Sequence, residues 1–427
     1  MRILLIHNRY ALRGGEDEST DAEQALLEEN GEAVDLYEVS NEGLPSSTTL
    51  EPRRLHSAFL LGTRSIWSRA AYRNVYRRVE SFRPDVVHVQ NSFPQLSPAV
   101  HHAARAAGAA VVQTLRNYRQ LCPKASFYRD GNTCEDCLGK RFPTPSLQHG
   151  CYRDSRAATA WVAGGQVIHN AIGTWETKVD LYISPSDYTK RKFVDSGFAP
   201  AERIVVKPNF LVADPGPGDG AEGHYLYVGR LSAEKGIRTL MAAWPLVADG
   251  QQLTIIGNGP LNREVDSFVR RNPEVTWRGR VPNHEVLAEM GRARALVFPS
   301  EWYETFGRVA MEAFARGTPV IGADIGAVGE IVGGSAGGVL FAAGDAAALA
   351  DRINTLATDH ERVAEMRREA RLTYEAKYRA DQNYDQLIAA YEQARHNADP
   401  VNRRSATPSR AREAGRPRSR SGGPLRE

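Results

Sequence analysis

Residues 299–321 read PSEWYETFGRVAMEAFARGTPVI, and this stretch decides the fold. The apolar run 295–298 before it predicts a strand that ends at Pro299-Ser300. A polar turn follows, and the pattern predicts a helix from 305 to about 317. The apolar residues 318–321 predict the next strand. A strand, a polar loop, a helix and a second strand therefore follow one another within some 25 residues.

Two glutamates, Glu304 and Glu312, flank the start of that predicted helix with seven residues between them. On a helix beginning at 305 they lie on roughly the same side, about 12 Å apart at ~1.5 Å per residue. With that spacing, the two carboxylates could hold two parts of one elongated ligand. The spacing does not suit a pair of carboxylates that share a proton. The free N–H groups of residues 305–307 can hold a phosphate. The alternative is a capping glutamate and a solvated one.

The same alternation recurs in both halves of the chain. In the first half, a strand at 2–7, a loop containing Gly14-Gly15, a helix at 16–30 and a strand at 33–39 resemble the opening of a doubly wound α/β domain. The second half restarts with a strand at 224–228, and further strands are expected at 252–257, 274–278, 295–298 and 318–322. With 427 residues, 42% of them hydrophobic, the chain can form two domains with their own cores. We expect two doubly wound, Rossmann-like domains that face each other across a cleft.

Composition shifts set the expected boundaries. The first domain takes residues 1–208, and the Gly-, Pro- and Asp-rich stretch 209–223 is expected to link it to a second domain at 224–378. A last helix covers 379–396. Residues 397–427 hold eight arginines against three acidic residues and few large apolar ones, which predicts a disordered tail.

Two further loops of the second half carry candidate ligand groups. The segment 229–236, GRLSAEKG, places Arg230 and Lys235 between glycines, and fixed cations there can neutralise two phosphates. The alternative is a pair of solvated side chains. The segment 277–282, WRGRVP, contains Arg280 and Val281, where a nucleotide base could stack or accept backbone hydrogen bonds.

All four cysteines, Cys122, Cys134, Cys137 and Cys151, fall within one turn-rich insertion at 122–151. The pattern C-x11-C-x2-C-x13-C could supply four thiolates to a tetrahedral structural zinc. Four unligated thiols are the alternative. Four thiolates leave no open position on the metal, so a catalytic zinc is not expected.

Residues 53–83 combine eight arginines, one acid and interleaved aromatic residues. Such helices can lie on an anionic membrane surface or can pack on a core with a solvated arginine face. The first residues, MRILLIHNRY, are too short an apolar run for a signal peptide, and no later stretch reaches the length of a membrane span. We expect a cytoplasmic protein, loosely membrane-associated if the arginine-rich helices bind lipid. No specific nucleic acid partner is indicated.

Taken together, GRLSAEKG, IIGNGP, the WRGRV loop and PS-x-W-Y-E-T-F-G followed by Glu312 resemble glycosyltransferase family 4, retaining enzymes of the two-domain GT-B type. The resemblance covers residues 1 to about 391, and it implies that the last helix, 379–396, crosses back to the first domain. It implies that Arg230 and Lys235 hold a diphosphate, that Glu312 binds the ribose and that Glu304 binds the transferred sugar. It also implies that eight further residues contact the donor: Gly14, Gly15, Gly229, Arg280, Val281, Thr305, Phe306 and Gly307.

The chain departs from the family at Arg116, where relatives often have a histidine. Arg116 and Asn117 are therefore candidates only for a sugar or acceptor contact. His88 alternates within an apolar strand, which is typical of a structural residue.

The resulting expectation is a retaining glycosyltransferase that moves a sugar from a nucleotide diphosphate sugar to a sugar or lipid-linked acceptor, in polysaccharide or lipid-linked glycan synthesis. No D-x-D motif is present, which agrees with a donor site that requires no metal or other cofactor for catalysis. Two alternatives remain: a nucleotide-sugar epimerase, which would need acid/base carboxylates beside the sugar, and a non-catalytic scaffold that binds sugar nucleotides or lipids.

Overall fold

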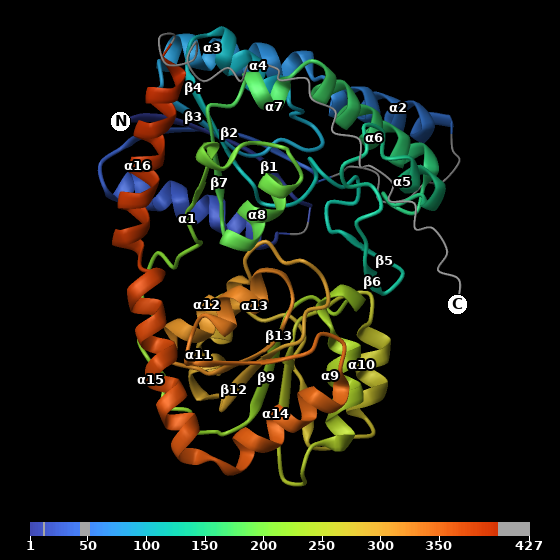
Figure 1. The fold of residues 1–427 in the computed structure, drawn as a ribbon, viewed down its shortest axis with the longest axis vertical. Helices are drawn as coiled ribbons and strands as arrows, with labels where there is room; N and C mark the ends of the chain where they lie inside the picture. The colour runs from blue at the N-terminus through green and yellow to red at the C-terminus, as the bar shows by residue number, and fades with distance from the viewer. Residues whose placement is uncertain (12, 43–51, 400–427) are drawn as a thin grey trace, which may run out of the picture.

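Two parallel six-stranded sheets form the framework of the protein (Figure 1). The computed structural model describes residues 1–11, 13–42 and 52–399. The first sheet has the order β2-β1-β3-β4-β7-β8. Its strands are β1 (Arg2–Arg9), β2 (Ala33–Ser40), β3 (Val86–Asn91), β4 (Ala110–Thr114), β7 (Leu181–Ser184) and β8 (Ile204–Val206). Its helices are α1 (Gly15–Glu29), α2 (Pro52–Ile66), α3 (Arg69–Phe82), α4 (Ala99–Ala106), α6 (Arg156–Ala171), α7 (Thr174–Thr177) and α8 (Asp187–Asp195).

The second sheet has the order β11-β10-β9-β12-β13-β14. Its strands are β9 (Tyr225–Val228), β10 (Leu253–Ile256), β11 (Val275–Trp277), β12 (Ala295–Phe298), β13 (Val320–Ala323) and β14 (Gly338–Phe341). Its helices are α9 (Ile237–Ala243), α10 (Asn262–Val269), α11 (Asn283–Arg292), α12 (Arg308–Ala315), α13 (Gly326–Gly333), α14 (Ala346–Thr358) and α15 (His360–Lys377).

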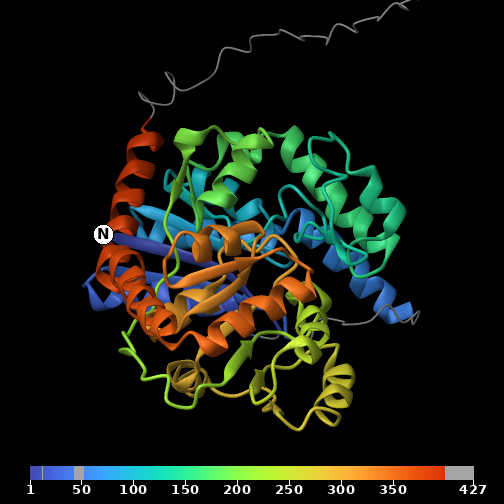
Figure 2. The same cartoon turned by 60° about the horizontal axis from the view of Figure 1, so that its bottom comes forward.

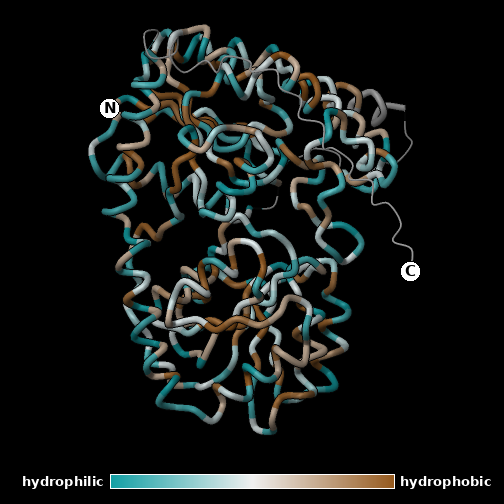
Figure 3. The backbone as a smooth tube through the Cα atoms, viewed as in Figure 1, coloured by the Kyte–Doolittle hydropathy of each residue, from teal (hydrophilic) through white to brown (hydrophobic). Residues whose placement is uncertain are grey.

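Each sheet is a doubly wound, Rossmann-like sheet, as the sequence predicted. The strands named above pair in parallel throughout both sheets. Apolar side chains cover both faces of each sheet, so each domain has its own core. Figure 3 shows hydrophobic residues along the strands of each domain. The prediction missed β14, which is short and follows a glycine-rich turn.

The strand orders locate where a ligand can bind. In the first sheet the order reverses between β1 and β3, and in the second between β9 and β12. A ligand of a doubly wound sheet lies at such a switch point, beyond the carboxyl ends of the strands. The loops that leave β1, β9 and β12 are those that carry Gly14-Gly15, residues 229–236 and residues 299–307.

The last helix, α16 (Ala380–Ala398), returns to the first domain and packs against β4 and β7 (Figures 1 and 2). Its buried residues Leu387, Tyr391 and Ala394 share a core with Ile3 and Val112. The Tyr391 hydroxyl also lies 2.9 Å from His88 Nδ1. This helix therefore forms a second connection between the two domains, and its first turns pack against Phe210 of the linker.

The start of α12 corrects one prediction. The helix begins at Arg308, three residues later than expected, because Gly307 has a φ of 95° and ends the loop in a left-handed conformation. A Cβ on Gly307 would lie 2.9 Å from the Phe298 ring, so only glycine fits. Glu304 consequently lies in the loop before the helix and not, as predicted, directly at its mouth.

The predicted basic region forms two helices, α2 and α3. In the part of the chain that the structure describes, no helix is both long and apolar enough to cross a membrane. The arginine-rich tail after Asp399 lies outside the described residues.

Candidate active site

A cavity of about 430 Å³ lies between the two domains, at the switch points of both sheets. The first domain contributes the start of α1 and Arg116, and the second contributes the loops after β9 and β12. The predicted residues that line it are Gly15, Arg116, Gly229, Arg230, Lys235, Glu304, Thr305, Phe306, Gly307 and Glu312. Residues more than 200 positions apart therefore form one site, large enough for a small-molecule ligand.

Lys235 and Glu304 form an ion pair in this cavity. Lys235 Nζ lies 2.5 Å from Glu304 Oε1, and the Ser300 hydroxyl donates to the same oxygen at 3.0 Å. Lys235 also lies over the Trp302 ring, 5.1 Å from its centroid. Both charges are partly buried, so a ligand that enters here meets a cation and an anion in contact.

Arg230 lies on the exposed wall of the same cavity. Among the residues that the structure describes, no carboxylate forms a salt bridge with it. Its charge is thus available to an anionic ligand beside that of Lys235.

Glu312 lies in the interior wall of the cavity and is only 4% exposed. Arg308 Nε donates to its Oε1 at 2.9 Å, and Arg308 also approaches Glu18 of the first domain at 3.5 Å. Burial raises the pKa of Glu312, and the Arg308 charge opposes that rise. One arginine therefore connects the second glutamate to the opposite domain.

Two buried N–H donors of this cavity have no partner among the described residues. They are Trp302 Nε1 and Arg308 Nη1, and both side chains line the cavity. A buried N–H without an acceptor costs about 1–3 kcal/mol, which a ligand with oxygen acceptors can recover. Sequence reasoning missed Arg308 and Trp302, although both stand within the stretch between Ser300 and Glu312.

Four predicted residues lie outside this cavity. Arg280 is exposed, and Val281 packs against the core of the second domain. Gly14 precedes the lining residue Gly15 without lining the cavity itself. Asn117 lines a neighbouring cavity, and its Nδ2 donates to Glu16 Oε1 at 3.0 Å.

The neighbouring cavity, of about 70 Å³, lies wholly in the first domain and shares Arg116 with the larger one. Amide and aromatic side chains line it, among them Gln90, Gln113, Gln166, Trp161 and Trp175. It therefore offers both hydrogen-bonding groups and ring faces close to the larger cavity.

Arg116 takes part in a buried charge network. Its guanidinium donates to Gln90, Asn209 and Glu23 at 2.7–3.1 Å. Lys207 lies 2.8 Å from the same Glu23 carboxylate. Burial alone would raise the pKa of Glu23, but the two cations hold it well below its usual range. The arginine that replaces the expected histidine is thus held in position, with its charge neutralised.

The four cysteines surround a small cavity inside the predicted insertion, and none forms a disulfide. Burial raises the pKa of the Cys137 and Cys151 thiols.

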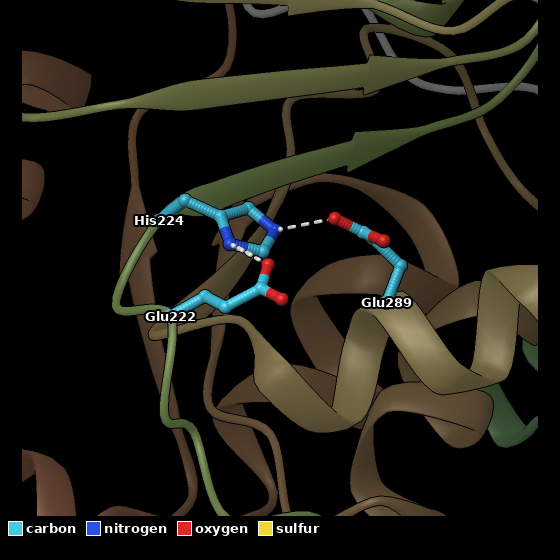
Figure 4. A group of neighbouring side chains, drawn as sticks. All are labelled: Glu222, His224 and Glu289. Atoms are coloured by element: carbon cyan, nitrogen blue, oxygen red, sulfur yellow. Dashed lines mark ion pairs between the residues drawn. The ribbon is translucent and has the colours of Figure 1, made fainter.

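Another group has ligand atoms within 4.8 Å of one another: Glu222, His224 and Glu289 (Figure 4). His224 lies 3.6 Å from Glu222 and 3.2 Å from Glu289. Arg278 and Arg292 already neutralise these carboxylates, at 2.7 Å from Glu289 and 2.9 Å from Glu222. Because two guanidinium groups repel a further cation, we interpret this group as a salt-bridge cluster beside β9.

Two family models match the chain, one in each half. The family model for glycosyl transferases group 1 matches residues 222–359, and the model for the glycosyl transferase 4-like domain matches residues 24–209. The first of these models covers all six strands of the second sheet, and the other covers the first sheet except β1. The chain belongs to glycosyltransferase family 4.

Among curated relatives, this family 4 chain is 39% identical over 140 residues to a glycogen synthase of Mycobacterium tuberculosis, over 31% of this chain and 34% of the relative. It is 33% identical over 168 residues to the 2-deoxystreptamine glucosyltransferase of Streptomyces kanamyceticus, over 38% of this chain and 42% of the relative. The chain therefore spans between about a third and a half of the length of these relatives.

Among solved structures, the Anabaena protein HepE in complex with UDP-glucose has a TM-score of 0.63 at 17% identity, over 92% of this chain and 99% of HepE. The sucrose-phosphate synthase of Thermosynechococcus elongatus has a TM-score of 0.65 at 19% identity, over 92% of this chain and 98% of the synthase. These likenesses show the shared fold, two Rossmann-like domains of the GT-B type.

Proposed function

We propose that this family 4 chain is a retaining glycosyltransferase that moves a sugar from a nucleotide diphosphate sugar to an acceptor. The observation that carries the proposal is the interdomain cavity, in which two cations, two glutamates and the start of α12 come together. Family membership and a structural neighbour bound to UDP-glucose support a nucleotide-sugar donor.

The diphosphate binds between the loop after β9 and the start of α12. Arg230 and Lys235 supply positive charge, and Gly307, which caps the helix without a side chain, leaves the first N–H groups of α12 accessible. The diphosphate gains negative charge as it leaves the sugar. Fixed cations and dipoles that face it stabilise that transition state, and no metal ion is needed for this role.

The Lys235–Glu304 ion pair connects donor binding to sugar binding. When a phosphate takes the Lys235 charge, the Glu304 carboxylate loses its partner and can accept hydrogen bonds from the sugar. Glu304 then faces the carbon at which positive charge develops as the diphosphate departs. The same carboxylate therefore binds the transition state more strongly than the substrate.

Glu312 and Arg308 suit the nucleoside end of the donor. Glu312 is buried in the cavity wall and can accept hydrogen bonds from ribose hydroxyls, while Arg308 holds it in place. The unpartnered Arg308 Nη1 and Trp302 Nε1 provide donors for phosphate or sugar oxygens.

The acceptor enters from the first domain, where the smaller cavity meets the larger one at Arg116. Its amide groups and tryptophan faces suit the polar and apolar sides of a sugar. The exposed apolar residues Phe59 and Trp67, with Ile168 of α6 and Ile172 directly after it, favour loose contact with an anionic membrane and hence a lipid-linked acceptor. We place the reaction in the cytoplasm, in polysaccharide or lipid-linked glycan synthesis.

The experiment is a turnover assay with a panel of nucleotide diphosphate sugars on the wild type and two variants, Arg230→Ala and Lys235→Ala. Loss of one hydrogen-bonding group that faces the leaving diphosphate raises the activation free energy by about 2.7–4 kcal/mol. Each variant should therefore lose roughly 10²- to 10³-fold in kcat. Arg238→Ala is the matched control, because Arg238 is exposed and pairs with Glu264 outside the cavity. Near-normal activity in a folded Arg230→Ala or Lys235→Ala variant removes that residue from the diphosphate role. If the wild-type protein binds sugar nucleotides but does not turn them over, it is a non-catalytic scaffold.

A further inference from the structure

The cysteine-containing insertion has little regular structure of its own. Between Cys122 and Cys151 it forms only the hairpin β5 (Tyr128–Arg129) and β6 (Asn132–Thr133) and the short helix α5 (Thr144–His149). Ala125, Phe127 and Asp130 have positive φ angles, between 50° and 67°. Such conformations cost free energy and persist only where surrounding contacts impose them. A segment this small gains stability from a cross-link or a metal.

The four cysteine side chains come from separate turns and surround one cavity of about 20 Å³. Cys122 lies in the loop after β4, Cys134 directly follows β6, Cys137 lies three residues later and Cys151 follows α5. A space of that size accommodates about one water-sized sphere. Thiolates are ligands that zinc prefers, and four of them complete its tetrahedral shell.

The surroundings of the cavity suit thiolate ligands. A hydrogen bond from the Ser146 backbone to the Cys137 sulfur would stabilise a bound thiolate. Arg129 and Lys124 also line the cavity and offset part of the negative charge of a four-thiolate site. The four sulfurs do not form a group as compact as that of Glu222, His224 and Glu289, so a bound ion would draw the turns inward.

We propose that Cys122, Cys134, Cys137 and Cys151 bind one structural zinc ion, and that the closed site holds the β5–β6 hairpin against the loop 299–307. The second part follows from contacts across the domain boundary. The Phe127 ring lies 6.2 Å from the Tyr303 ring, and Tyr118 packs on Phe127 at 5.1 Å.

Charged groups extend this contact. Glu135, between Cys134 and Cys137, lies 2.6 Å from Lys192 Nζ, and Lys192 lies over the Tyr303 ring at 4.6 Å. Glu135 also accepts a hydrogen bond from Tyr303. Tyr303 stands between Trp302 and Glu304, so a loosened insertion releases the loop that carries both.

The metal is tested on the full chain, purified without chelator and analysed for zinc content. We expect one zinc per chain, released when a mercurial reagent titrates the thiols. Cys137→Ser should lose most of the zinc. Lys140→Ala is the matched control, since Lys140 is an exposed residue of the same insertion that does not line the small cavity, and this variant should keep the ion. The proposal is wrong if the folded wild-type protein contains far less than one zinc per chain and its four thiols titrate freely. It is also wrong if the four cysteines form two disulfides. Because this is measured on the wild type, a variant that fails to fold leaves the result intact.

The positioning role is tested by hydrogen exchange without any substrate, so its outcome does not depend on the proposed transferase activity. Removal of zinc with a chelator should increase exchange several-fold in peptides covering both 122–151 and 299–307. Peptides of β14 and α14, remote from the insertion, should not change. Faster exchange in 122–151 alone would limit the ion to local stabilisation and refute its effect on the loop.

Discussion

Replacement of Glu304 by glutamine tests the assignment of the cavity most directly. Glutamine keeps the size of the side chain and an oxygen acceptor but removes the charge. In the structure Glu304 is 8% exposed and accepts from Lys235 and Ser300, so the variant retains partners on both sides. We therefore expect a folded protein whose defect lies in the chemistry.

The magnitude follows from the lost charge. A hydrogen bond to a charged group contributes about 1.5–3 kcal/mol, and each 1.36 kcal/mol corresponds to a ten-fold change in rate. If the carboxylate acts only on the developing positive charge, the whole loss appears in the transition state. We expect kcat to fall roughly 10- to 150-fold while the donor KM changes little.

The assay is steady-state kinetics with donors that differ either in the sugar or in the base. Glu301→Gln is the control, because Glu301 lies in the same loop but bonds to Thr239 and does not line the cavity. Glu304→Gln should change the preference among sugars more than among bases. Wild-type kinetics in both variants, or a change in base preference alone, would show that Glu304 is a loop-stabilising residue and that the loop after β12 is not the sugar site.

Three further outcomes follow from the structure. Glu312→Gln should raise the donor KM several-fold with kcat nearly unchanged, because the proposed role of Glu312, which Arg308 holds in place, lies at the nucleoside end of the donor, remote from the broken bond. A large fall in kcat would contradict this role. Wild-type protein should float with anionic but not neutral vesicles at low salt, and a Phe59→Ser, Trp67→Ser double variant should float less; equal flotation on both lipids would refute the membrane contact. Burial lowers the pKa of His88 to about 4, below the 6.5 of the unfolded chain. Its contribution to the free energy of unfolding is therefore complete above about pH 6.5 and is lost as the pH falls toward 4. The loss is at most about 1.4 kcal/mol per pH unit. Urea unfolding between pH 7 and 5 should show a shallower loss in His88→Gln than in the wild type, and identical slopes would exclude this histidine.

The sequence by itself determined the alternation of strands and helices and the loops that carry the site. Apolar runs such as 295–298, glycine-flanked loops such as 229–236 and the spacing of Glu304 and Glu312 are local patterns, and local propensity and hydrophobic periodicity reveal them. Alternating strands and helices predict parallel strands, and because parallel strands end at the same edge of a sheet, the loops after β9 and β12 leave it together.

Only the tertiary structure decided which charges meet. Lys235 and Glu304 are 69 positions apart, and Arg308 reaches Glu18 in the other domain. The sequence offered Arg116 as a candidate for a sugar or acceptor contact, and only the structure shows that Glu23 and Asn209 hold its guanidinium. The start of α12 also differs from the prediction, because Gly307 adopts a left-handed conformation and the nearby Phe298 ring leaves no room for a Cβ there. Such contacts depend on distances between remote segments, which packing of the two cores and the returning helix α16 sets and which no local pattern encodes.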